Sequence, residues 1–187
     1  KLLKYKKMIK FVYQNVPKGT GDAVLKTKRF ITDKYFLMLL PDDLIIKKNC
    51  SKSMINVHQK YKSSVMASMQ VNKSTVSRWG IYNLSKRLSK SDYLISDVVE
   101  KPSIKDAPSN KAVIGRYILP KTIFKKLKNQ NSGKGGEIHI TDAIQSLIKD
   151  NENFIAHNFS GKYLDCGTMN GYINSGKKIS NLWNYAW

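Results

Sequence analysis

The stretch from Phe36 to Asp43 constrains the fold of this chain more than any other. Five apolar residues, Phe36–Leu40, stand in a row between polar segments, and Pro41 and two aspartates follow at once. A run of this length is short for a helix and is typical of a strand buried on both faces of a parallel sheet, which the proline then ends. Ligands of open α/β sheets bind beyond the carboxyl ends of strands, so Asp42 or Asp43 stands where a metal-bound phosphate can be held. The alternative is an ordinary turn, because Pro-Asp-Asp is also common turn chemistry.

The length and the cysteines set the broad class. The 187 residues suffice to bury one core, and we expect a single domain over residues 1–187. The longest apolar run is the strand just described, so we expect no membrane segment, no membrane partner and no secretory leader. Cys50 and Cys166 lie far apart and make no ligand pattern with the three histidines. This favours a reducing compartment, the cytoplasm, and no structural zinc.

The formal net charge of +20 makes nucleic acid a candidate partner, because a basic surface attracts phosphate backbones whatever their sequence. The basic residues are nearly all lysine, however, and they are spread along the whole chain. Arginine is the residue that forks onto guanine and stacks on bases. It occurs only at Arg29, Arg78, Arg87 and Arg116. We interpret the lysines as a solvated surface and expect no specific nucleic-acid binding.

Apolar periodicity and turn residues predict alternating strands and helices. The predicted strands are 9–13, 36–40, 64–71, 81–84, 93–99, 112–119, 154–159 and a strand from 162 that ends at the carboxylate of Asp165. The predicted helices are 22–30, 54–61, 120–128 with Pro120 in its first position, 141–150 with Thr141 as its cap, and 170–180. Residues 181–187 form a C-terminal tail. A strand, a glycine-containing loop, a helix and a second strand make βαβ units, which favour an α/β fold.

Six motifs then follow one another in a single order. They are Gln14-x-x-Pro17-x-Gly19-x-Gly21-x-Ala23-Val24, Leu39–Asp43, Val99–Pro102, Ala107–Tyr117, Gly135–Ala143 and Tyr163–Gly167. Together they closely resemble the bacterial UTP–glucose-1-phosphate uridylyltransferases (UDP-glucose pyrophosphorylases) of the sugar nucleotidyltransferases. The resemblance covers nearly the whole chain. It implies a Rossmann-like α/β fold, with a mixed, mostly parallel sheet flanked by helices.

The resemblance also implies a reaction. UTP and glucose 1-phosphate are joined into UDP-glucose, and pyrophosphate is released. The sugar phosphate oxygen attacks the α-phosphorus in line, so catalysis is mostly positioning and charge neutralisation. Mg²⁺ is the implied cofactor, and Asp42 and Asp165 are its implied ligands. The resemblance also implies that Asp42 is a catalytic residue. We expect these two carboxylates, each near a strand end, to meet at one rim of the sheet.

The same resemblance assigns substrate contacts. Lys101, also catalytic, would bind the phosphate of the sugar phosphate, and Glu100 would accept hydrogen bonds from glucose hydroxyls. Gln14 would bond to the uracil edge, and Gly19 would let backbone groups approach the base. From periodicity alone, however, Glu100 and Lys101 are an exposed pair at a strand end.

Three further residues are implied on the sugar side. Gly80 and Gly115 would contact the hexose through the backbone, and Glu137 would contact the sugar, although a helix-entry role for Glu137 is equally compatible with its position. Thr141 and Asp142 are interpreted as a helix cap, and His139 as structural.

Two departures from the family pattern stand out. Nothing here corresponds to the strand and Gly-x-Gly-Thr-Arg loop that open the family and cradle the nucleotide phosphates, and Asp22 stands where relatives commonly carry His or Gln. A sheet without its first strand exposes an edge, so we expect residues 1–187 to be inactive by themselves. Family members usually associate, so we expect a homo-oligomer. The alternatives are a nucleotidyltransferase for another base or sugar, such as a thymidylyltransferase, and a non-catalytic sugar-nucleotide-binding fragment.

Overall fold

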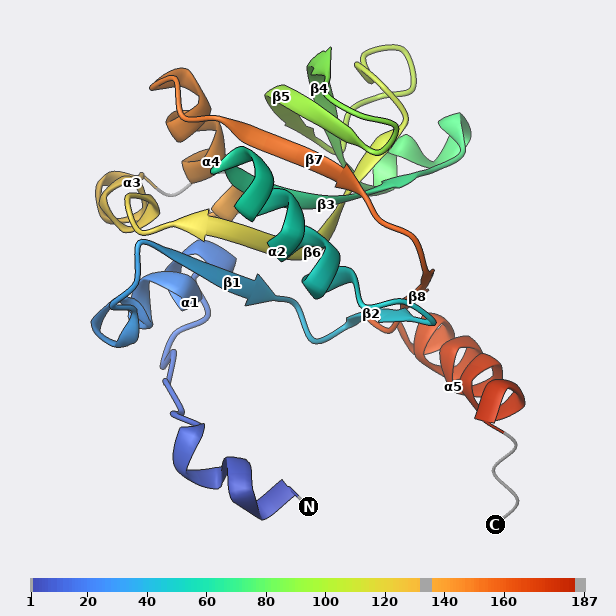
Figure 1. Cartoon of the computed structure of the whole chain (residues 1–187), viewed down its shortest axis with the longest axis horizontal. Coiled ribbons are helices and arrows are strands. Elements are labelled where there is room, and N and C mark those ends of the chain that lie inside the picture. Colours follow the sequence, from blue (N-terminus) through green and yellow to red (C-terminus); the bar gives the residue numbers. More distant parts are fainter. Residues whose placement is uncertain (1, 132–135, 184–187) are drawn as a thin grey trace.

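A mixed sheet with helices on both faces forms the body of the protein (Figure 1). We describe it from a computed structural model, in residues 2–131 and 136–183. The main sheet has the strand order β1-β6-β3-β7-β5-β4, and a small second sheet pairs β2 with β8. The strands are β1 (Tyr35–Leu39), β2 (Asp43–Ile46), β3 (Ser64–Gln70), β4 (Gly80–Arg87), β5 (Asp92–Glu100), β6 (Lys111–Pro120), β7 (Phe154–Asn158) and β8 (Lys162–Asp165).

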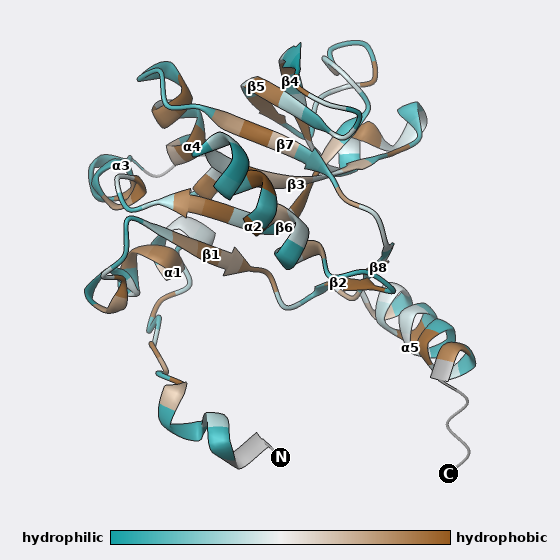
Figure 2. Cartoon of the chain, in the orientation of Figure 1, coloured by the Kyte–Doolittle hydropathy of each residue, from teal (hydrophilic) through white to brown (hydrophobic). Residues whose placement is uncertain are grey.

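Helices cover both faces of the main sheet because its strands are apolar on both sides. The α-helices are α1 (Thr20–Lys26), α2 (Cys50–Tyr61), α3 (Ile123–Asn129), α4 (Ile140–Lys149) and α5 (Met169–Trp183). Short 3₁₀ helices are η1 (Leu2–Met8), η2 (Lys28–Phe30) and η3 (Lys73–Arg78). In β3, Met66 faces the core beneath α1, α3 and α4, whereas Val65 and Ala67 face α2. Figure 2 shows the brown apolar strands between the helices. The predicted α/β class is confirmed.

The strand pairing differs from the prediction. Among the pairings that the described residues make in the main sheet, only β3–β7 is parallel; β1, β5 and β4 pair antiparallel. Within the described residues β1 is an edge strand, with Leu37 37% and Leu39 50% exposed, so the run that begins at Phe36 is not buried on both faces. The reason is that an apolar run indicates a strand but not the direction or identity of its neighbours.

Several single elements also differ from the prediction. Residues 9–13, predicted as a strand, have no regular structure, and Tyr13 is 82% exposed. Pro120 closes β6 opposite Tyr35 instead of opening α3. The end of a strand and the first position of a helix both suit proline, which has no backbone N–H. Thr141 lies inside α4, whose N-cap is His139 without a side-chain cap bond.

The last predicted segments fall partly outside the described residues. Of the predicted tail, 181–183 belong to α5, and 184–187 lie outside the description, as do 132–135 of the glycine-rich loop. No helix in residues 2–131 or 136–183 combines the length and apolar character that crossing a membrane requires.

Candidate functional site

The pairing of β2 with β8 brings the two predicted metal ligands together. Asp43 lies opposite Asp165 in this ladder, and the Cys166 N–H donates to the Asp42 carbonyl oxygen at 2.8 Å. A Cβ placed on Gly167 would lie 2.9 Å from Asp42 Oδ2 and 3.4 Å from Asp165 Oδ1. Both carboxylates therefore face one small volume, which we call the carboxylate rim (Asp42, Asp165, Gly167). The antiparallel ladder of the small second sheet forms it, rather than two strand ends at one rim of the main sheet, as the sequence led us to expect.

The donor set of the rim fits a hydrated divalent cation. Asp42 is exposed, and Asp165 Oδ1 already accepts the Gly167 N–H at 2.9 Å. No cluster of three or more His, Cys, Asp or Glu residues suited to a metal occurs in the described part of the chain. Mg²⁺ commonly takes one or two protein carboxylates and completes its shell with water and substrate phosphates. Two carboxylates with the space that Gly167 leaves suit that mode, and their role as ligands stays a prediction.

Asp43 is a structural residue. Its Oδ2 accepts the Gly115 N–H at 2.6 Å, and its Oδ1 accepts the Tyr163 hydroxyl. Burial, and then the hydrogen bond to Asp43, raise the pKa of Tyr163 above its usual range, so Tyr163 remains a neutral donor. Arg116 donates to the Leu40 carbonyl oxygen at 2.7 Å and also to that of Asp43. Of the two neighbouring aspartates, only Asp42 thus keeps its carboxylate available.

Gly115 is required by close packing. Its carbonyl oxygen accepts the Leu40 N–H at 2.8 Å, and a Cβ on Gly115 would approach Leu40 Cβ to 2.6 Å. Because its N–H is bound by Asp43 and its carbonyl by Leu40, both backbone groups of this predicted hexose contact are already engaged.

Gly80 and Glu100 lie opposite each other where β4 begins and β5 ends. A Cβ on Gly80 would lie 3.1 Å from Glu100 Oε2. Burial, followed by the charges of Asp43 and Glu100, raises the pKa of Tyr117 above its usual range. The charges of Glu100 and Asp43 therefore both act on the buried hydroxyl of Tyr117.

Lys101 leaves β5 in a left-handed conformation, with φ of 46°. Its N–H donates to the Trp79 carbonyl oxygen at 3.0 Å, and its side chain is exposed. The Trp79 ring meets the Tyr163 ring edge-on with centroids 5.8 Å apart. The segment before β4 thus joins Glu100 and Lys101 to the strand that carries Asp165.

The remaining predicted residues form a second group around Ile138. The Gly21 N–H donates to the Ile138 carbonyl oxygen at 2.8 Å. Gly19 has φ of 92°, and a Cβ there would lie 2.8 Å from that same oxygen and 3.0 Å from the Cβ of Glu137, so this position needs glycine. Gln14 Nε2 donates to the Gly19 carbonyl oxygen at 3.2 Å.

Sequence reasoning gave no role to Asp22 or Arg78. Asp22 is 5% exposed, and its Oδ2 accepts Gln14 Nε2 at 2.7 Å, so it orients the predicted base-binding amide. Arg78 Nη2 lies 4.0 Å from Asp165 Oδ2 at the carboxylate rim. The only sequence signal for Arg78 is its place two residues before Gly80.

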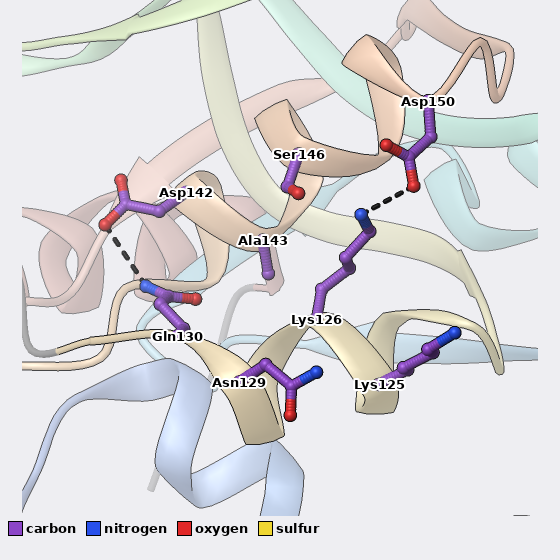
Figure 3. Close-up of a pocket in the computed structure, with 8 residues that line it drawn as sticks. All are labelled: Lys125, Lys126, Asn129, Gln130, Asp142, Ala143, Ser146 and Asp150. Atoms are coloured by element: carbon purple, nitrogen blue, oxygen red, sulfur yellow. Dashed lines mark hydrogen bonds and ion pairs between the residues drawn. The ribbon is translucent and has the colours of Figure 1, made fainter.

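The hollow in Figure 3, about 300 Å³ in volume, lies between α3 and α4 and does not include the rim. Lys126 Nζ is 2.5 Å from Asp150 Oδ2, and Gln130 Nε2 donates to Asp142 Oδ2 at 3.2 Å. Because these polar groups pair with one another along its walls, we assign no ligand to this hollow.

Comparison with known proteins decides the family. The model of the nucleotidyl transferase family matches residues 2–181. The chain belongs to the nucleotidyl transferase family. Among curated nucleotidyl transferases, it is 37% identical over 169 residues to a putative UTP–glucose-1-phosphate uridylyltransferase of Methanocaldococcus jannaschii, covering 90% of the chain and 59% of that protein. It is 38% identical over 168 residues to a UTP–glucose-1-phosphate uridylyltransferase of Pseudomonas aeruginosa, covering 88% and 60%.

Comparison with solved structures supports the same family assignment. A UDP-glucose pyrophosphorylase complexed with UDP-glucose matches with a TM-score of 0.85 and 39% identity, over 92% of this chain and 66% of that one. A UTP-bound enzyme from Acinetobacter baumannii matches with a TM-score of 0.76 and 30% identity, over 88% and 57%. The resemblance predicted from the six motifs is confirmed. The chain spans about three fifths of the length of the curated relatives it matches.

Proposed function

We propose that the complete protein transfers the uridylyl group of UTP to glucose 1-phosphate, producing UDP-glucose and pyrophosphate. The observation that carries this proposal is the convergence of Asp42 and Asp165 on Gly167. The likeness to proteins named for this reaction, and to structures titled as UDP-glucose and UTP complexes, supports it. The in-line displacement needs little more than positioning and charge neutralisation, which such a rim suits.

At the rim, Asp42 and Asp165 would hold Mg²⁺, and the bound cation would supply positive charge at the nucleotide phosphates. Lys101 places its ammonium on the phosphate of the sugar phosphate, and Glu100 accepts hydrogen bonds from glucose hydroxyls. Gly80 leaves room for the hexose beside Glu100. Gly115 supports the hexose site by packing closely against Leu40 and Asp43, because its backbone N–H and carbonyl oxygen are already hydrogen-bonded.

At the other group, Gln14 recognises the base. Its amide nitrogen is bound to Gly19 and Asp22, which leaves the amide oxygen to accept from the uracil N3–H. Gly19 allows the loop backbone to approach the base, and Glu137, whose side chain is half exposed, contacts the sugar.

The decisive experiment is a pyrophosphate-release assay on the complete protein. We expect turnover with UTP, glucose 1-phosphate and Mg²⁺, less with dTTP or another sugar phosphate, and UDP-glucose identified by mass spectrometry. Asp42→Asn should lower kcat by at least about a hundredfold, whereas exposed Asp33→Asn, the matched control, should not. Faster turnover with dTTP would favour a thymidylyltransferase. Calorimetric binding of UDP-glucose without any turnover would favour the non-catalytic alternative.

We also propose that the protein acts in the cytoplasm as a homo-oligomer. Both cysteines are free thiols, which suits a reducing compartment. The association rests on the family resemblance, and light scattering during size-exclusion chromatography of the complete protein tests it.

A further inference from the structure

Arg78 lies between the proposed sugar contacts and the carboxylate rim. It ends η3, and Gly80, which faces Glu100, follows two residues later. In the other direction its Nη2 is 4.0 Å from Asp165 Oδ2. Arg78 therefore contacts the rim through its side chain and is joined through two residues of backbone to the glycine that faces Glu100.

The backbone that carries Arg78 is firmly held, while its side chain is free to turn. Val76 is buried, and the Trp79 N–H donates to its carbonyl oxygen at 3.0 Å. The Trp79 carbonyl in turn accepts the Lys101 N–H, and its ring packs on Tyr163. The Arg78 side chain is 64% exposed. The guanidinium can therefore exchange partners without any movement of the backbone.

The other arginines have different surroundings. Arg116 binds backbone carbonyl oxygens, Arg87 donates to the Ser89 carbonyl oxygen at 2.9 Å, and the Arg29 guanidinium lies 4.7 Å from the centre of the Phe30 ring. Arg78 is paired with a rim carboxylate, through an exposed contact of a kind that adds little stability.

We propose that Arg78 is a substrate-binding residue that holds, together with Lys101, the phosphate of the hexose 1-phosphate; this rests on the proposed function. A planar guanidinium matches two phosphate oxygens at once, which an ammonium does not. If the sugar is at Glu100 and the nucleotide at the rim, the phosphate that joins them lies between these two places, and Arg78 is the arginine that contacts a rim carboxylate in the described residues. The guanidinium then leaves Asp165 for the phosphate, and that carboxylate becomes available to the proposed cation.

Kinetics of the complete protein test this role. Arg78→Ala should raise KM for glucose 1-phosphate about 10- to 100-fold while KM for UTP changes less than about twofold. Arg78→Lys keeps the charge but loses the planar guanidinium, so its KM for glucose 1-phosphate should lie between those of the wild-type protein and Arg78→Ala. Arg87→Ala, which removes an arginine from β4 away from the rim, is the matched control and should leave both constants unchanged. An unchanged KM for glucose 1-phosphate in Arg78→Ala and Arg78→Lys would overturn the proposal.

Calorimetry separates this inference from the proposed function. Glucose 1-phosphate and glucose are titrated into the wild-type protein and into Arg78→Lys, with circular dichroism to verify folding. A loss of affinity for glucose 1-phosphate with no change for glucose supports the phosphate contact, even if the wild-type protein releases no pyrophosphate. An equal loss for both ligands overturns it, because it indicates a general disturbance of the pocket.

Discussion

Two adjacent aspartates have different roles because only one of them is bonded within the fold. Asp43 accepts from Gly115 and Tyr163, whereas Asp42 is exposed beside Asp165. We expect Asp43→Asn to lower the free energy of unfolding by about 2–3 kcal/mol, because charge-assisted bonds are lost and an amide N–H₂ faces a donor. Asp42→Asn should change it by less than about 0.5 kcal/mol.

Thermal unfolding of the complete protein measures both effects, and the pyrophosphate assay gives the contrast in activity. The result that contradicts the assignment is the reverse pattern, with Asp42→Asn the less stable variant and Asp43→Asn the inactive but stable one.

The two cysteines should differ in reactivity. Cys50 is 4% exposed, and burial raises its pKa to about 11 against an opposing effect of the Arg116 charge, whereas Cys166 is half-buried beside the rim. At pH 8 a pKa near 11 leaves Cys50 about a hundredfold less thiolate than an ordinary thiol. A disulfide reagent should therefore label Cys166 first, and Cys50 only in denaturant.

The raised pKa of Cys50 also makes the stability of the fold depend on pH. The unfolded Cys50 thiol ionises near pH 9 while the folded one stays protonated, so its contribution to stability is present below pH 9 and declines as the pH rises toward 11.

The labelling prediction is checked by mass spectrometry, which identifies the cysteine that carries the label. Equal labelling rates in Cys50→Ser and Cys166→Ser would contradict the prediction.

At the scale of elements, a buried polar network ties α2 to β5 and β7. His157 Nδ1 is 2.7 Å from Asp92 Oδ1, and His157 Nε2 is 3.1 Å from Ser53 Oγ. This order resembles a nucleophile triad, but the Ser53 hydroxyl donates to the Cys50 carbonyl oxygen at 2.7 Å and not to the imidazole. The network is therefore a structural connection between elements.

We expect His157→Ala to lower the free energy of unfolding by about 3 kcal/mol, because Asp92, 5% exposed, loses the imidazole and keeps the Ser89 hydroxyl, which donates to its Oδ2 at 2.7 Å. Ser53→Ala removes one neutral hydrogen bond and should cost about 1 kcal/mol. Chemical denaturation measures both variants. Equal losses would show that the pairing with Asp92 contributes nothing special.

Local sequence patterns predicted the positions of the elements better than they predicted which strands pair with each other. The apolar runs of β3, β6 and β7 and the periodicity of α2 place these elements within a few residues of the structure. Strand direction was not predictable, because the antiparallel pairing of β6 with β1 and β3 depends on contacts between residues far apart in sequence. The 9–13 run failed as a strand because alternating apolar residues form a strand only where a partner is available.

At the scale of the molecule, the motifs led to the rim, but its geometry came from the fold. The sequence pointed to Asp42 and Asp165, and the β2–β8 ladder brings them together. Arg78 and Asp22 were missed because each contacts a side chain that local patterns do not place beside it: Asp165, distant in sequence, for Arg78, and Gln14, across the turn of the glycine-containing loop, for Asp22. Type and spacing alone do not reveal such partners.

The open edge of β1 leads to a last prediction, for a protein limited to residues 1–187. In the described residues β1 pairs on one side only, and Leu39 is half exposed there. Unpaired apolar edges promote association between chains. Leu39→Lys should reduce light scattering on heating several-fold. Ile104→Lys, which places the same charge at an exposed loop position, is the control and should not. If both variants reduce scattering equally, added charge rather than the open edge governs association.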